Sequence, residues 1–165
     1  MAVWKETENW AFEYFDINEK LPKIAPFESF IDLWQEKRGT RLAPAWNDFQ
    51  LEDLTEWWGS VIVLDCQQTP FDFCYRLFGS NAVQLFGLDI TGKWASELIG
   101  GEYDLEDDIP FYEMLVQNPS MSYTYGSIHW QNRHHIKCAF LELPLSDDNK
   151  TITNMISILH HDGVQ

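Results

Sequence analysis

The stretch YRLFGSNAVQLFGLDITGKW, residues 75–94, decides which fold the sequence predicts. It follows an apolar run, and its three glycines stand roughly where a phosphate-binding loop would lie. Such a loop needs the pattern G-x-x-x-x-G-K-[ST], yet seven residues separate Gly79 from Gly87, and Lys93 is followed by Trp94. The glycines therefore predict turns and not a nucleotide site: Gly79 ends a strand, and Gly87 takes the left-handed position after a short helix.

The sequence on both sides of this stretch predicts strands. Two strands lie before it, separated by the turn QQTP, and form a hairpin; three more lie near the C-terminus, where short turns make them antiparallel neighbours. Short helices lie between the two groups. We expect an α+β domain whose five-stranded antiparallel sheet is covered on one face by these helices. The predicted strands are residues 60–66, 71–78, 121–130, 135–145 and 151–161.

Two helices are predicted before the first strand. Residues 26–39 place their apolar side chains at the i, i+3, i+4 and i+7 spacing of one helical face and end in a glycine. Residues 47–59 show a similar face, and Asn47 with Gln50 fits a capping box. We expect both helices to flank the sheet.

The N-terminal residues complete a helical extension in this prediction. Ala11, Tyr14 and Phe15 suit a short helix. We therefore expect residues 1–58 to form an N-terminal helical extension and residues 59–165 to form the domain. The extension has more apolar surface than one small sheet can cover, which predicts a homodimer.

Composition limits the classes of partner. The 165 residues contain 26 Asp and Glu against 11 Lys and Arg, a net charge of −15. A surface of this sign repels nucleic acid and anionic lipid, so neither is an expected partner. We find no signal-peptide pattern and no membrane-spanning run, and expect a cytoplasmic protein in which Cys66, Cys74 and Cys138 are buried, reduced thiols.

Residues 79–99, GSNAVQLFGLDITGKWASELI, resemble the part of PAS domains in which the second strand passes into the first short helices. The matching features are an Asn after the strand, an apolar residue and Gly closing the helix, and Gly-Lys before another short helix. The order of two strands, short helices and three strands is also that of the PAS fold.

The chain also resembles small bacterial proteins in which one PAS domain follows N-terminal helices. It departs from their pattern at Trp46, where they have Arg, and it lacks their proline shortly after Asp48; a contact made by that Arg in relatives would be lost here. The matching stretches, within residues 27–160, are Trp34, Arg38-Gly39-Thr40-Arg41, Pro44-Ala45-Trp46-Asn47-Asp48, Tyr75-Arg76, Gly79, Ile90-Thr91-Gly92 and Leu143-Pro144-Leu145-Ser146.

The resemblance implies a non-catalytic sensory or regulatory domain that acts by binding a small molecule, a signalling partner or both. It also implies a cavity between the sheet and the short helices, with a filled aromatic core as the alternative; no particular ligand or cofactor is identified. An enzyme and a haem-binding PAS sensor remain alternative functions. Besides Arg76, the expected lining residues are Trp94, Phe111, Tyr112, Leu115, Tyr125 and Cys138.

Arg76 is a charged residue within the apolar strand FDFCYRLF. A half-buried guanidinium needs a carboxylate or carbonyl partner. We expect a buried salt bridge, to Asp48 in the first place and to Glu142 in the second. The alternative is that Arg76 binds the anionic group of a ligand.

The candidate metal ligands are the histidines and the acidic residues 102–108. Adjacent histidines on a strand point to opposite faces, so only one of each pair could join a site. The acidic run lacks the spacing of a calcium loop and predicts a solvated, helix-capping segment. The histidines are His129, His134, His135, His160 and His161.

Overall fold

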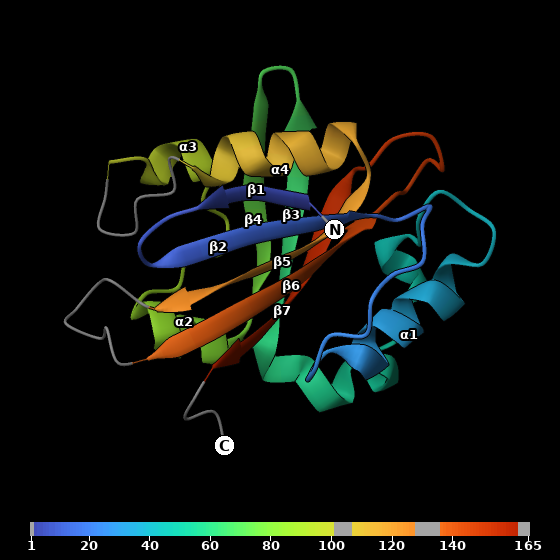
Figure 1. Cartoon of the computed structure of the whole chain (residues 1–165), viewed down its shortest axis with the longest axis horizontal. Helices are drawn as coiled ribbons and strands as arrows, with labels where there is room; N and C mark the ends of the chain where they lie inside the picture. The colour runs from blue at the N-terminus through green and yellow to red at the C-terminus, as the bar shows by residue number, and fades with distance from the viewer. Residues whose placement is uncertain (1, 101–106, 128–135, 162–165) are drawn as a thin grey trace.

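Seven antiparallel strands form one sheet in the order β1-β2-β5-β6-β7-β3-β4 (Figure 1). The computed structural model describes residues 2–100, 107–127 and 136–161. The five strands expected from residue 60 onward are all present and contiguous in this order, which confirms the predicted α+β class. The strands are β1 Ala2–Glu6, β2 Trp10–Asp16, β3 Val61–Gln68, β4 Phe71–Phe78, β5 Ser120–Ser127, β6 Lys137–Leu145 and β7 Asn154–His161.

The N-terminal residues differ from the predicted helical extension. Residues 2–16 form a β-hairpin that adds two strands to the sheet, so the short helix expected around Ala11, Tyr14 and Phe15 is wrong. The segment WAFEYFD fits both a helical and an alternating spacing of apolar residues. Its pairing with β5 runs without a break from Trp10–Gly126 to Asp16–Ser120, and this continuous ladder decides in favour of the strand. The boundary after residue 58 stays a prediction.

Of the two α-helices predicted before β3, one is present and the other differs in type. Helix α1, Glu28–Arg38, confirms the first prediction. The second region forms two 3-10 helices, η1 Trp46–Asp48 and η2 Leu51–Ser60, instead of an α-helix. Asn47 and Gln50 do not form the expected box; instead the carboxylates of Asp48 and Asp53 accept the backbone N–H groups of Ala45 and Gln50, each at 2.8 Å.

Three short α-helices connect β4 to β5, as expected. They are α2 Ser80–Phe86, α3 Ala95–Leu98 and α4 Asp108–Gln117. Gly87 follows α2 with φ 76°, the predicted left-handed conformation. Gly79 precedes it, where a Cβ would lie 2.4 Å from the carbonyl oxygen of Gly59, so the sharp bend into α2 requires a glycine.

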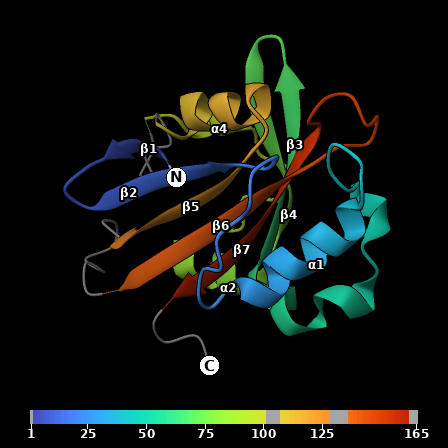
Figure 2. The same cartoon turned by 45° about the vertical axis from the view of Figure 1, so that its right-hand side comes forward.

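The two faces of the sheet are covered by different helices. On one face the α4 residue Phe111 packs against Phe12 of β2, with ring centres 5.2 Å apart. On the other, Phe27, just before α1, packs against Tyr123 and His160. Figure 2 shows α1 and the neighbouring 3-10 segments grouped at one side of the sheet, away from α4. The face beneath α4 is therefore separate from the face that holds the N-terminal helix.

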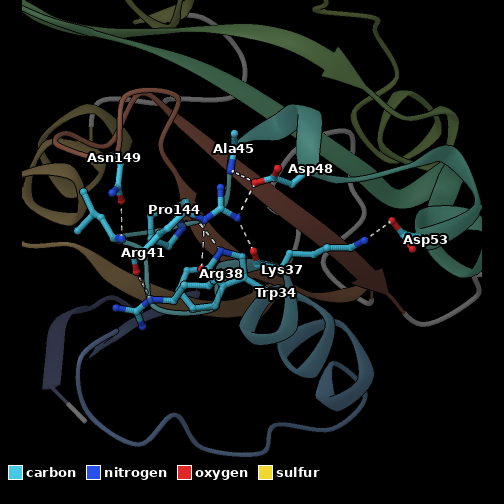
Figure 3. A network of polar contacts seen from close by, with 10 residues as sticks. Trp34, Lys37, Arg38, Arg41, Ala45, Asp48, Asp53, Pro144 and Asn149 are labelled. Carbon is cyan, nitrogen blue, oxygen red and sulfur yellow. Dashed lines mark hydrogen bonds and ion pairs between the residues drawn. The ribbon is translucent and has the colours of Figure 1, made fainter.

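Some of the stretches that resemble bacterial PAS proteins, those of α1, η1 and the end of β6, meet at one junction (Figure 3). Trp34 donates its indole N–H to the carbonyl oxygen of Pro144 at 2.8 Å, inside the core. Arg41 pairs with Asp48 at 2.8 Å. Arg38 donates to the backbone oxygen of Ile17 at 2.6 Å. These residues fasten the N-terminal segment to the sheet, which is a structural role.

We expect Trp34→Phe to lower the free energy of unfolding by about 2 kcal/mol or more, because it leaves the buried Pro144 carbonyl without its donor and removes packed indole atoms. Urea unfolding measures this. The control is Trp58→Phe, at a position 47% exposed, which should change stability by about 0.5 kcal/mol or less. Equal urea midpoints of unfolding for the two variants would contradict a stabilising role of the junction.

Candidate functional site

A cavity of about 330 Å³ lies between the sheet and the helices that follow β4. Its wall is largely aromatic, and its polar side chains gather on the floor and at the rim. The aromatic residues include Trp10, Phe12, Phe78, Phe86, Phe111 and Phe140. The polar residues of the floor are Thr124, Glu142 and Ser157. The volume lies in the range of sites that bind small molecules.

The register of the sheet places the polar floor. Glu142 of β6 lies directly opposite Ser122 of β5 and Ser157 of β7, so these three side chains form a row across the central strands. All three are almost completely buried, with Glu142 2% exposed. Alternation along β6 sends its apolar neighbours Leu141 and Leu143 to the opposite face. A carboxyl group is thus fixed in the core beneath the cavity.

Hydroxyl groups surround the Glu142 carboxyl. Those of Tyr112, Ser122 and Thr124 lie close to it and favour its ionised form. Within the described part of the chain, Glu142 Oε2 and the hydroxyl oxygens of Ser122 and Ser157 have no hydrogen-bond partner. Buried polar atoms in native proteins seldom lack a hydrogen bond. The row is therefore a candidate site for a further polar contact.

Burial sets the charge of Glu142. Loss of water raises the pKa of its carboxyl to about 8, and the negative charge of Asp108 contributes in the same direction, while the nearby hydroxyls oppose the shift. Burial also raises the pKa of Tyr75 and Tyr112 well above the usual value. At pH 7 the floor therefore holds a mostly neutral carboxyl between neutral phenols.

The N-terminal hairpin contributes to the rim. Lys5 of β1 forms an ion pair with Asp107, just before α4, at 2.7 Å. Trp4 of β1 packs against Phe111 with ring centres 5.0 Å apart. Thr7 and Asn9, in the turn between β1 and β2, also line the cavity. The cavity thus depends on a part of the chain that the sequence predicts to be helical.

The structure places the expected lining residues in several environments. Phe111 and Tyr112 line the cavity. Leu115 is buried in the core, and Trp94 pairs through its backbone with Cys74 of β4.

Tyr125 and Cys138 lie at a second, shallower hollow with Tyr123 and His160. Burial raises the pKa of the Cys138 thiol to about 12, so it is neutral at physiological pH. Ligand binding by any of the six residues stays a prediction.

Arg76 corrects the prediction of a buried salt bridge. Its side chain is 48% exposed, and its nearest carboxylate is Asp65, with Nη1 3.6 Å from Oδ1. The expected partners are engaged elsewhere, since Asp48 pairs with Arg41 and Glu142 lies in the floor. The physical reason is that β4 is an edge strand, and alternation turns Tyr75 inward and Arg76 toward solvent.

Sequence reasoning does not single out Glu142 as a site residue. Its signal is its place in FLELPL, where an acidic residue interrupts an apolar strand near the C-terminus. Alternation alone allows such a residue to face solvent. Only the position of α4 over this face shows that Glu142 is enclosed.

Within the described residues, no three His, Cys, Asp or Glu side chains gather to hold a metal ion. His129, His134 and His135, and the acidic residues 102–106, lie outside the described residues. In the same described part of the chain, no helix combines the length and the apolar character that crossing a bilayer requires.

Comparison with known proteins identifies one family. The family model for the PAS domain matches residues 23–160. This range includes α1, the 3-10 segments and the strands from β3 to nearly the end of β7, and excludes the β1–β2 hairpin. No curated protein and no solved structure matches the chain significantly.

Glu142 should make stability depend on pH. Its folded-state pKa is raised to about 8, so its stabilising contribution is complete below its unfolded pKa of about 4.3 and is lost as pH rises through 8. Between pH 5 and 8 we expect wild type to lose up to about 1.4 kcal/mol per pH unit relative to Glu142→Gln. Urea unfolding at pH 5, 6.5 and 8 measures this, with the exposed Glu56→Gln as the control. If the free energy of unfolding changed with pH equally in wild type and in Glu142→Gln, Glu142 would not be a titrating buried group.

Proposed function

The chain belongs to the PAS domain family, and on that premise we propose that it is a sensor or regulator that holds a small molecule in the cavity above β5, β6 and β7. Family membership supports a sensory or regulatory role. The observation that favours ligand binding is the row of buried polar atoms without partners, within a cavity of about 330 Å³. A domain that used its sheet only for stability would gain nothing from an unsatisfied carboxyl oxygen in its core.

The proposed action is binding without chemical conversion. The Cys66 and Cys138 thiols, whose pKa burial raises to about 12, are poor nucleophiles because the thiolate is the reactive form. The neutral Glu142 could exchange a proton with a ligand, which also serves recognition. The enzymatic and haem-binding alternatives have no comparable observation in their favour among the described residues.

The homodimer stays a prediction, but one argument for it does not hold. The apolar side chains of α1, including Phe30 and Trp34, are buried within the same chain and offer no uncovered face. Leu51 and Trp58, both in η2, are exposed apolar side chains that a second copy or a signalling protein could contact. A cytoplasmic location likewise remains part of the proposal.

A cavity-filling substitution tests the proposed site. We expect small molecules found by thermal-shift screening to raise the Tm of wild type by several degrees, since a ligand bound only by the folded state stabilises it. Ser157→Leu should fold, as judged by circular dichroism, and lose this response because the larger side chain occupies the cavity floor. Ser29→Leu, at an exposed position of α1, is the matched control.

Native mass spectrometry of the same three proteins would check that a ligand copurifies with wild type and with Ser29→Leu but not with Ser157→Leu. The proposed site would be wrong if a ligand stabilised Ser157→Leu as much as it stabilises wild type.

A further inference from the structure

We propose that the cavity selects an organic cation, namely an ammonium group attached to a compact aromatic or apolar body, and that Glu142 binds the ammonium group. This inference rests on the proposed function and specifies its class of ligand. Three independent features support it: the sign of the charges at the cavity, the unpartnered acceptors of its floor, and its aromatic wall.

The charges of the described lining residues disfavour an anion. The ionisable lining residues are three carboxyl groups, Asp107, Asp108 and Glu142, and two phenols, Tyr75 and Tyr112. Among the described lining residues there is no Lys, Arg or His. Lys5 reaches the rim, but it is paired with Asp107. With a net charge of −15 over the whole chain, a carboxylate or phosphate would enter against the field, while a cation would be attracted.

The floor offers acceptors to an ammonium group. Glu142 Oε2 and Ser157 Oγ are buried, lie on adjacent strands in register, and have no hydrogen-bond partner among the described residues. An ammonium group has three N–H donors and no acceptor, so it suits a site made of a carboxylate and hydroxyl oxygens. A bond between N⁺–H and a carboxylate is also the stronger, charge-assisted kind.

The wall suits both parts of such a ligand. Trp10, Phe12, Phe111 and Tyr112 come from strands and from α4, and line the same space as Glu142. Faces of aromatic rings attract cations, more strongly where water is excluded, and they pack well against an aromatic body. An anion would gain nothing from these faces.

Binding of the cation should release a proton. Glu142 is mostly protonated at pH 7 because burial raises its pKa to about 8, and an ammonium group beside it would favour the ionised form. The titratable groups that influence it are Asp108 and Tyr112 of α4 and Tyr75 of β4. The phenols, whose pKa is raised further, keep their protons. Glu142 is therefore the group from which the proton leaves.

The test uses three probes that share a phenyl group and differ in charge: 2-phenylethylamine, 2-phenylethanol and 3-phenylpropanoate. Isothermal titration calorimetry of the full chain at pH 7, in phosphate and in Tris, measures affinity and the number of protons released. We expect the amine to bind at least tenfold more tightly than the alcohol, the acid to bind most weakly, and the amine to release close to one proton. Its affinity should rise roughly tenfold per pH unit between pH 6 and 7.5 while that of the alcohol stays constant.

Glu142→Gln should bind the amine and the alcohol within about threefold of each other and release no proton. Glu56→Gln, which changes an exposed carboxylate, should behave as wild type. If Glu142→Gln does not fold, the pH dependence measured with wild type decides the question by itself.

The outcomes distinguish the two proposals. Equal or tighter binding of the alcohol or the acid would overturn the cation preference and leave the cavity as a ligand site. An amine preference that persists in Glu142→Gln, or an affinity for the amine that does not change with pH, would overturn the role of Glu142. If none of the three probes binds at millimolar concentration while a screened ligand still depends on Ser157, the inference fails alone; if no ligand depends on Ser157, the proposed function fails too.

Discussion

Pairing of the last strand, β7, with β3 is the constraint on which the structure depends. Antiparallel contacts from Val61–Ile158 to Asp65–Asn154 join β3 to β7, although almost a hundred residues separate them in the chain. Because both strands are central and nearly all of β7 is buried, the segment between β4 and β5 must cross one face of the sheet. That crossing places α4 against β2, β4 and β5 and encloses the cavity. Fold and candidate site therefore follow from the same long-range pairing.

The position of Glu142 within this arrangement opposes stability. A carboxyl group buried between hydroxyls loses hydration, and its partners leave one oxygen unsatisfied. Natural sequences usually avoid such positions in a sheet core and accept them mainly where function requires them. The surrounding aromatic packing can sustain the cost, because Phe12 and Phe111 bury large apolar surfaces close by. Recognition and stability thus make opposite demands on one residue.

Part of the pattern that resembles the family lies away from the cavity. Trp34, Arg41 and Asp48 belong to the junction that fastens α1 and η1 to the end of β6. Trp46 packs against Phe49 in the same region, with ring centres 6.4 Å apart. This part of the family pattern therefore concerns how the N-terminal segment docks onto the sheet, whereas Tyr75 of the same pattern lines the cavity. Neither part identifies a ligand.

The sequence by itself determined the elements whose signals are local. Alternation and short turns specify β3 to β7, and the apolar spacing of α1 and the glycine after α2 specify those helices. The pairing of β2 with β5 and of β3 with β7, and the enclosure of side chains, were decided only by the tertiary structure. Residues 10–16 became a strand because β5 offered a free edge, Arg76 turned to solvent because β4 is an edge strand, and Glu142 became buried because α4 covers its face. The local pattern of apolar residues indicates which side chains share a face of an element. Their burial and charge depend on what packs against that face, and those contacts come from residues far away in the sequence.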